Sequence, residues 1–226
     1  MDPCGDRCRR FVPIIEAGTD SRFLSTDTIF TDVTAPGLAT QPTYVYSTVF
    51  VDIDYRDQPG NPHRGGFWRA TFGSWDDRNL QRYDFRRFDG EAAHFFPLSP
   101  RDVFAAHAVL SYVNNETGHR VPFYALPYVG GADTIRAFDE FRFRDENALA
   151  VSAEYRRDLH RYVEGVLFVD GGEVRRNWND IDFRDWKWAY GAGARIKAAN
   201  RVIFRADIGA GGGEGAKLFL KFGKSF

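Results

Sequence analysis

The sequence predicts an all-β fold, either a transmembrane antiparallel β-barrel or the C-terminal portion of one. Apolar and polar residues alternate with a period of two in segments that recur to the end of the chain. Compact connections alternate with long ones, as they do at the two ends of a membrane barrel. Charged residues stand at mid-strand on the parity opposite the apolar one, where the packed interior of a small soluble barrel would exclude them.

About nine or ten strands are expected, each close to the ~9–11 residues that a tilted strand needs to cross a bilayer. The period-two segments are Thr43–Arg56, Gly66–Trp75, Tyr83–Phe96, Val103–Tyr112, Asn147–Arg157, Arg161–Gly172, Ala189–Lys197, Val202–Ala210 and Ala216–Phe226. A weaker candidate covers Arg10–Gly18. The apolar parity of the last segment consists of Leu218, Leu220, Phe222 and Phe226. Its other parity carries Lys217 and Lys221, so this segment shows the pattern most clearly.

The connections support a barrel with short turns at one end and long loops at the other. The compact connections, rich in Pro, Asp, Asn or Gly, are 57–65, 97–102, 158–161 and 198–200. The long ones are 114–147 and 174–188. The glycine-rich run Gly209–Gly215 is expected to be the hairpin loop between the last two strands. No repeat or linker interrupts the pattern, so residues 1–226 are predicted to form a single domain.

Alternation alone does not separate a membrane barrel from a soluble one, because either type alternates. The mid-strand charges that favour a polar lumen are Glu154, Arg156, Asp170, Lys217 and Lys221. Aromatic residues near strand ends are typical of interfacial girdles: Trp68, Trp75, Tyr83, Phe95, Phe96, Trp186 and Trp188. The chain also ends on a strand with a terminal Phe. We therefore favour the membrane barrel.

The chain start carries little signal. Cys4 and Cys8 have no histidine or further cysteine nearby, so no metal site is predicted and residues 1–9 are expected to be poorly ordered. No apolar run reaches the ~18 residues of a membrane helix, and no signal peptide is visible. If the protein is exported, the signal lies on sequence upstream of this one. The barrel domain is also expected to be N-terminally incomplete.

Several motifs together resemble the C-terminal barrel of the bacterial surface-antigen family, the outer-membrane assembly and translocation proteins of BamA and TamA type. In the long loop, Gly130-Gly131 precedes the run Ile135-Arg136-Ala137-Phe138. The strand Ala153–Arg156 (AEYR) follows, and then Phe168–Gly172 (FVDGG), which is similar to the family's Phe-x-Asp-x-Gly motif. The stretch Asp52–Gly66 and the terminal LFLKFGKSF, similar to a C-terminal targeting strand, complete a resemblance that covers about Thr43 to Phe226.

The resemblance implies that the long loop folds back into the lumen and that Arg136 reaches Asp170 and Glu154 on the inner wall. Independently of the family, both acids fall on the lumen parity of adjacent strands, about 5 Å apart directly or 7–8 Å diagonally. A guanidinium can satisfy two carboxylates in one fork. The family has Gly where this chain has Ala137; if that position needs a positive φ, Ala costs roughly 1 kcal/mol.

The sequence offers no catalytic constellation. The five histidines are scattered, and no HExxH, GxSxG or phosphate-binding loop is present. His94 and His107 could lie on neighbouring strands, but no Ser partner stands out. Basic residues (30) and acidic residues (31) are nearly balanced and interleaved, so no nucleic-acid partner is expected. No enzyme activity, cofactor or metal is predicted.

The resemblance implies a function in insertion of outer-membrane proteins or in polypeptide translocation, at the bacterial outer membrane. The implied partners are the lipid bilayer, unfolded outer-membrane or secreted polypeptides, and other barrel-assembly subunits or further copies of the chain that close the barrel. The resemblance implies no catalytic step: a weakly paired seam beside Ala216–Phe226 would template an incoming strand. No periplasmic transport-associated domains are recognised in the chain. A passive pore or structural barrel, and a soluble barrel that binds an apolar ligand, remain as alternatives.

Overall fold

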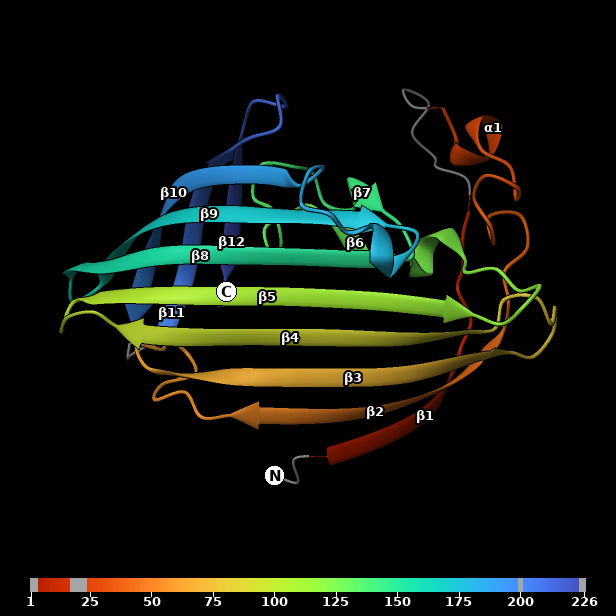
Figure 1. Cartoon of the computed structure of the whole chain (residues 1–226), viewed down its shortest axis with the longest axis horizontal. Helices are drawn as coiled ribbons and strands as arrows, with labels where there is room; N and C mark the ends of the chain where they lie inside the picture. Colours follow the sequence, from red (N-terminus) through yellow and green to blue (C-terminus); the bar gives the residue numbers. More distant parts are fainter. Residues whose placement is uncertain (1–3, 17–23, 199–200, 224–226) are drawn as a thin grey trace.

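A computed structural model describes residues 4–16, 24–198 and 201–223 of the chain. Ten antiparallel strands of this part form one sheet, in the order β1-β2-β3-β4-β5-β8-β9-β10-β11-β12. Their bounds are β1 Cys4–Phe11, β2 Tyr44–Asp54, β3 Gly65–Asp77, β4 Phe85–Pro97, β5 Asp102–Asn115, β8 Asn147–His160, β9 Val163–Arg175, β10 Lys187–Ala198, β11 Arg201–Ala210 and β12 Ala216–Phe222. Strands consecutive in sequence are neighbours in the sheet, apart from the insertion between β5 and β8 (Figure 1). The predicted all-β antiparallel fold is confirmed.

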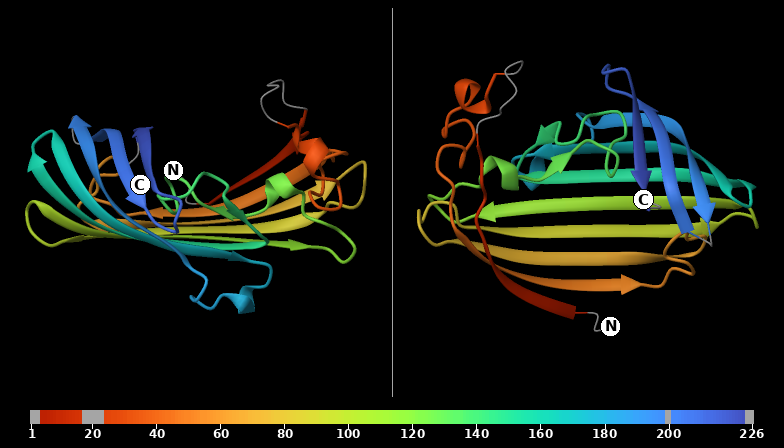
Figure 2. Two further views of the ribbon diagram at one scale, coloured as in Figure 1. Left: turned by 90° about the horizontal axis from the view of Figure 1, so that it is seen from above. Right: turned by 180° about the vertical axis from the view of Figure 1, so that it is seen from behind.

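The sheet curves into a deep trough rather than lying flat (Figure 2). The insertion between β5 and β8 lies on its concave side and carries the short pair β6 (Tyr128–Val129) and β7 (Phe143–Arg144). The remaining elements are short helices: α1 (Thr26–Ile29), η1 (Phe123–Ala125) and η2 (Trp178–Asp180). Within the described residues, β1 and β12 are the two edges of the sheet.

The first strand differs from the sequence-based expectation. Residues 4–9 were expected to be poorly ordered and Arg10–Gly18 to be a weak strand, whereas the strand is Cys4–Phe11. It pairs along its whole length with β2, from Cys4 opposite Val51 to Phe11 opposite Tyr44. This long-range pairing supplies the backbone hydrogen bonds, and a polar segment without strong periodicity gives no sign of it. Residues 17 and 18 lie outside the described part, as does Phe226.

The two faces of the sheet differ in polarity as the alternation predicts. Apolar side chains are exposed on the convex face, among them Val49, Val51, Ile53, Trp68, Phe72, Phe96, Leu167, Val169, Trp188, Tyr190, Ile208, Leu218, Leu220 and Phe222. The concave face buries charged side chains, including Glu154, Arg156, Glu164, Asp170, Arg195, Arg205 and Asp207. In the described residues, no helix combines the length and hydrophobicity that crossing a membrane would require.

The aromatic girdle is only partly as expected. Trp68, Phe96 and Trp188 are exposed on the convex face. The other four aromatic residues pack inside the protein: Trp75, Tyr83, Phe95 and Trp186. Trp75, for example, stacks between Tyr46 and Phe85, with ring centroids 5.8 and 5.0 Å apart. Position near a strand end therefore did not determine which side of the sheet an aromatic ring takes.

Two buried apolar clusters join the inserted loop to the sheet. One consists of Val129, Ile135, Ala137, Phe138, Ala148, Ala150 and Ala189. The other consists of Tyr44, Tyr83, Phe85, Val113 and Val121. Since Val129, Ile135 and Phe138 come from the loop and Ala148, Ala150 and Ala189 from β8 and β10, burial of loop side chains fixes the loop in the trough.

Candidate functional site

The loop tip is a closed turn built on two glycines. Gly130 and Gly131 have φ values of +121° and +92°, which L side chains rarely adopt. A Cβ on Gly130 would lie 2.4 Å from the carbonyl oxygen of Asp139, so the two arms of the turn touch. The amide of Gly131 donates to the carbonyl of Phe138 at 3.0 Å, and the hydroxyl of Thr134 donates to the carbonyl of Gly130 at 2.9 Å. This turn presents residues 135–138 to the concave wall.

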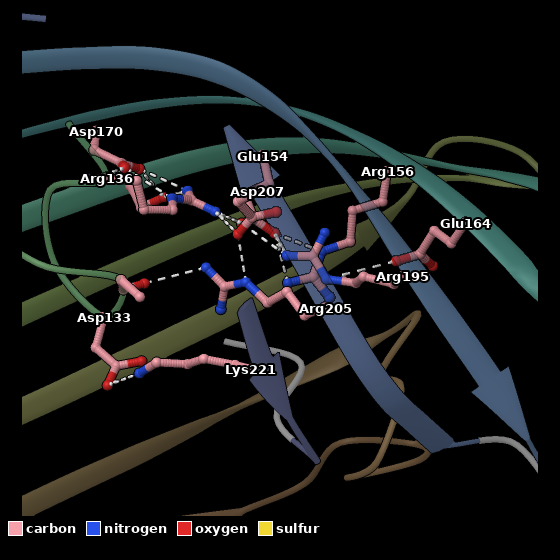
Figure 3. A network of polar contacts seen from close by, with 12 residues as sticks. Asp133, Arg136, Glu154, Arg156, Glu164, Asp170, Arg195, Arg205, Asp207 and Lys221 are labelled. Carbon is pink, nitrogen blue, oxygen red and sulfur yellow. Dashed lines mark hydrogen bonds and ion pairs between the residues drawn. The ribbon is translucent and has the colours of Figure 1, made fainter. Parts of the chain in front are cut away.

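Arg136 is part of a buried polar network on that wall, between Asp170 and the carboxylates of Glu154 and Asp207 (Figure 3). Its Nε and Nη2 donate to Oδ2 and Oδ1 of Asp170 at 2.8 and 2.6 Å, a two-pronged contact, and its backbone amide donates to Oδ2 at 3.0 Å. Nη1 donates to Glu154 at 2.5 Å and to Asp207 at 3.3 Å. Arg136 is 2% exposed, and Glu154 and Asp170 are 0% exposed. The structure thus brings Arg136 together with both expected wall residues.

The strand motif on β9 supports the same contact. The ring of Phe168 lies beneath the guanidinium of Arg136, with 3.6 Å from Cζ to the ring centroid, a cation–π geometry. Asp170 follows two residues later on the same face. A Cβ on Gly172 would lie 2.5 Å from the carbonyl of Leu149, so β8 approaches β9 closely there. The motif therefore supplies an aromatic ring and a carboxylate to Arg136, and its last glycine permits the close approach of the neighbouring backbone.

The sequence analysis missed five members of the network: Ser152, Glu164, Arg195, Arg205 and Asp207. Ser152 donates to Asp170 at 2.7 Å and accepts from Arg136 at 2.9 Å. Arg195 donates to both oxygens of Glu154 at 3.0 Å, and Arg205 donates to Asp207 at 2.5 Å. Ser152 shares the lumen parity of Glu154, and Arg205 shares the parity of Asp207, so parity was the available signal. The contact across the trough depends on sheet curvature, which parity does not reveal.

Charges in the network balance. Four buried arginines (Arg136, Arg156, Arg195 and Arg205) face four buried acids (Glu154, Glu164, Asp170 and Asp207). Burial alone lowers the pKa of Arg136, but the hydrogen bonds to Asp170 and the charge of Glu154 outweigh it and raise that pKa above its usual value. A buried pair costs desolvation, and removal of one partner leaves an uncompensated charge. The network is therefore sensitive to the loss of any one member.

The loop also contacts the edge strand β12. Lys217 bonds to Asp139 at 2.6 Å, and Lys221 bonds to Asp133 at 2.5 Å. Both lysines are on the lumen parity, as expected. The charged loop is thus bound at two places, by Arg136 to β8 and β9 and by its acids to β12.

Ala137, Gly209 on β11 and Gly212 in the β11–β12 turn each have a structural role that the sequence did not suggest. Ala137 is not among the described residues with positive φ, so the steric cost considered for an alanine at this position does not arise. Its side chain is 0% exposed and packs in the apolar cluster around Phe138. The backbone of Arg136 passes so close to Gly209 that a Cβ there would lie 1.6 Å from the Arg136 carbonyl oxygen. A Cβ on Gly212 would lie 2.2 Å from the ring of Phe138. These glycines provide space for the loop.

The C-terminal strand has the expected parity. Leu218, Leu220 and Phe222 are 65%, 57% and 81% exposed on the convex face. Residues 211–215 of the glycine-rich run form the turn between β11 and β12, whereas Gly209 and Ala210 belong to the end of β11. The two histidines considered for catalysis are separated by the sheet: His107 is buried beside Glu91 at 3.1 Å, whereas His94 contacts Tyr55 at 3.2 Å.

An antiparallel sheet with an apolar exposed convex face, a charged concave face and a long loop bound inside it defines the transmembrane β-barrel class. Residues 47–222 match the Omp85 superfamily domain, and the chain belongs to this superfamily of outer-membrane barrels of protein assembly and translocation. The resemblance to BamA- and TamA-type barrels is thereby confirmed.

A solved structure agrees with this assignment. The fold is similar to that of BamA from Haemophilus ducreyi lacking POTRA domains 1–3, with a TM-score of 0.67 and 14% sequence identity. The match covers 80% of this chain and 42% of that chain, so the present chain spans less than half the length of that BamA structure. A search of curated proteins found no match.

Proposed function

We propose that this chain acts as an outer-membrane barrel in the insertion of outer-membrane proteins or in the translocation of polypeptides. The observation that carries the proposal is the contact between the lumen loop and the edge strand β12. Family membership supports the assembly and translocation class, and the concave network supports a loop held in a fixed position. The proposed location is the bacterial outer membrane, with the lipid bilayer against the convex face.

The proposed mechanism is physical and involves no covalent step. Within the described residues β12 pairs with β11 alone, and it has 7 residues where β11 has 10. An unpaired strand edge can accept an added strand through main-chain hydrogen bonds. Because Lys217 and Lys221 tie β12 to the loop, the loop would set the position of that edge. Arg136, with Asp170 and Glu154, would serve as a structural clamp for the loop.

The proposed partners follow from this mechanism. Unfolded outer-membrane or secreted polypeptides would supply the incoming strand, and other barrel-assembly subunits or further copies of this chain could pair with the edges. A passive pore or structural barrel is the second candidate, since a polar concave face also suits a channel. A soluble barrel that binds an apolar ligand is disfavoured by the apolar residues exposed on the convex face and the charges buried on the concave face.

Site-specific photocrosslinking tests the edge-strand proposal. A photoreactive phenylalanine analogue is placed at Leu220 on β12, or at Leu167 inside the sheet on β9; these positions are 57% and 58% exposed. The chain is folded into liposomes, and an unfolded outer-membrane protein is added during its insertion. We expect crosslinks to the added polypeptide from position 220 and none from position 167. Equal crosslinking at both positions would contradict the edge mechanism.

Channel conductance in planar bilayers separates assembly from the pore. The pore alternative predicts stable conductance by the wild-type chain and no effect on the insertion rate of an added outer-membrane protein. The assembly proposal predicts faster insertion than in protein-free liposomes, with the acceleration lost when β12 is prevented from pairing.

A further inference from the structure

The turn between β2 and β3 reaches across the short-turn end of the trough. Its Gly60 carbonyl accepts a hydrogen bond from the amide of Val202 on β11, at 3.0 Å. Gly60 also approaches Arg201, because a Cβ on this glycine would lie 2.7 Å from the Arg201 Cγ. Strands β2 and β11 are far apart in the sheet order, so this turn joins distant parts of the sheet.

The same turn brings a histidine to two carboxylates. His63, Asp158 on β8 and Glu164 on β9 each offer one ligand atom, and these atoms all lie within 4.8 Å of one another. Asp158 and Glu164 are directly opposite each other in the β8–β9 ladder. Like charges directly opposite destabilise a strand pair; here Lys197 bonds to Asp158 and Arg195 Nε lies 4.0 Å from Oε1 of Glu164, so each carboxylate already has one neighbouring cation.

His63 is oriented as a metal ligand would be. Its Nδ1 lies 3.0 Å from the carbonyl oxygen of Asn61, a contact in which Nδ1 carries the proton and donates it. Nε2 is the ring nitrogen that faces the carboxylates, and it lies 3.6 Å from Oδ2 of Asp158. Two ligands of a tetrahedral zinc ion with bonds of ~2.0–2.2 Å lie about 3.4 Å apart. Lys197 bonds to Oδ1 of Asp158, which leaves Oδ2 directed at His63.

Two buried oxygens at this place lack hydrogen-bond donors. Glu164 is 2% exposed, and its Oε1 accepts no hydrogen bond; Arg195 Nε lies 4.0 Å away. Asn61 is also 2% exposed, and its Oδ1 is likewise without a donor. Asn61, His63 and Asp158 line a polar pocket of about 490 Å³ together with Arg161 and Lys197, and this pocket gives His63 and Asp158 room for water ligands; Glu164 does not line it.

We propose that His63, Asp158 and Glu164 bind a divalent transition-metal ion of the zinc class, with water completing its coordination. Such an ion takes imidazole nitrogen and carboxylate oxygen together, and a histidine ligand fixed through its second nitrogen by a carbonyl is the usual supporting arrangement around such an ion. The ion fastens the β2–β3 turn to the β8–β9 hairpin and so closes the short-turn end of the trough. This proposal stands independently of the assembly function.

Equilibrium dialysis with Zn²⁺ tests the proposal on the full chain folded in detergent and carrying no polyhistidine tag. The test variant is His63→Gln. The control is His119→Gln, because His119, Asp84 and Glu116 form another cluster of this kind among the described residues, and the Asp84 amide already donates to His119 at 3.2 Å. We expect one zinc ion per chain for the wild type and for His119→Gln, and none for His63→Gln. Equal zinc binding by His63→Gln, or no binding by the wild type, overturns the proposal.

Cobalt binding is a second measurement, and it separates metal ligation from a purely structural role of His63. If His63 only stabilised the fold, its replacement in a folded chain would leave the Co²⁺ spectrum unchanged. Co²⁺ in a tetrahedral nitrogen–oxygen site absorbs visible light far more strongly, and at longer wavelength, than the hydrated ion; we expect this intense absorption in the wild type and its loss in His63→Gln. Glu164→Gln is expected to weaken Zn²⁺ binding about tenfold or more. Folding of each variant is checked by heat-modifiable migration on a gel. A folded Glu164→Gln chain with wild-type zinc affinity removes Glu164 from the site and contradicts the three-ligand assignment.

Discussion

The carbonyl oxygen of Arg136 occupies the place where a side chain on Gly209 would begin, 1.6 Å from an ideal Cβ at that position. Gly209 lies on β11, and Arg136 lies on the loop that enters the trough. The loop can therefore take this position only because residue 209 has no side chain. The contacts of Arg136 to Asp170 and Glu154 depend on that position.

Gly209→Ala is expected to displace the loop. The matched control is Gly90→Ala on β4, where an added Cβ meets its first neighbour at 3.5 Å, an ordinary contact distance. Both changes remove a strand glycine, so intrinsic strand propensity favours alanine in each. Hydrogen exchange at the Arg136 amide should rise in Gly209→Ala and stay unchanged in Gly90→Ala. Unchanged exchange in both variants would show that the loop does not rest on Gly209.

Ala137→Gly, which restores the residue typical of the family, is expected to destabilise this protein by about 1 kcal/mol. The position has no positive φ to relieve, and the change removes a fully buried methyl group and adds chain entropy to the unfolded state. Urea unfolding in detergent micelles measures the effect. A gain in stability would mean that Ala137 is strained after all.

The convex face is expected to tolerate charge only near its rim. Val169 lies at the middle of β9 and Leu159 near the end of β8; they are 49% and 64% exposed. In a bilayer, Val169→Lys should cost about 2–4 kcal/mol and Leu159→Lys about 0–1 kcal/mol, because the cost of a lipid-facing cation depends on depth. Unfolding in liposomes gives both values. Near-zero costs at both positions would favour water on the convex face, as in a soluble barrel.

The segment before β2 should loosen in acid. Desolvation is the largest single influence on Asp32 and raises its pKa, but the hydrogen bonds from the Tyr83 hydroxyl and the amides of Ala39 and Gly37, with the charge of Arg82, together outweigh it and lower that pKa. A depressed pKa stabilises the fold above the ordinary value, about 4, and this stabilisation is lost as pH falls through the folded-state pKa.

Limited proteolysis of residues 24–43 measures the acid effect, with an acid-active protease at low pH, a neutral protease at neutral pH, and each rate divided by that of an unstructured peptide under the same conditions. Cleavage should increase below about pH 4 in the wild type. In Asp32→Asn the cleavage rate should be high already at neutral pH and should change less with acid. The same pH profile in both chains would assign the effect to another group.

The fold was largely predictable because a barrel sheet is assembled from neighbours in sequence. Each strand pairs with the next, so local alternation carries the strand positions and the two faces. The strand Cys4–Phe11 was missed because its order comes from pairing with β2. The aromatic residues Trp75 and Tyr83 were misplaced, since strand-end position says nothing about which side of the sheet a ring takes.

The site residues that share a strand parity and belong to a family motif could be predicted from the sequence. The residues brought in by the curvature of the sheet could not. Asp170 and Glu154 lie on adjacent strands with the same parity, so the sequence alone predicts that they are neighbours on one face. Asp207 and Arg195 join them because the curved sheet brings β10 and β11 over the loop. No pattern along the chain measures that curvature.

A double-mutant cycle between Arg136 and Asp170 tests most directly whether the buried loop arginine is a clamp. Arg136→Ala, Asp170→Ala and the double variant are unfolded in micelles, and the same cycle is run for the exposed loop pair Arg142 and Glu214, 2.8 Å apart. The clamp predicts a coupling free energy of about 1.5 kcal/mol or more for the buried pair and less than about 1 kcal/mol for the exposed one. A coupling free energy for Arg136 and Asp170 no larger than that of the exposed pair would contradict the clamp.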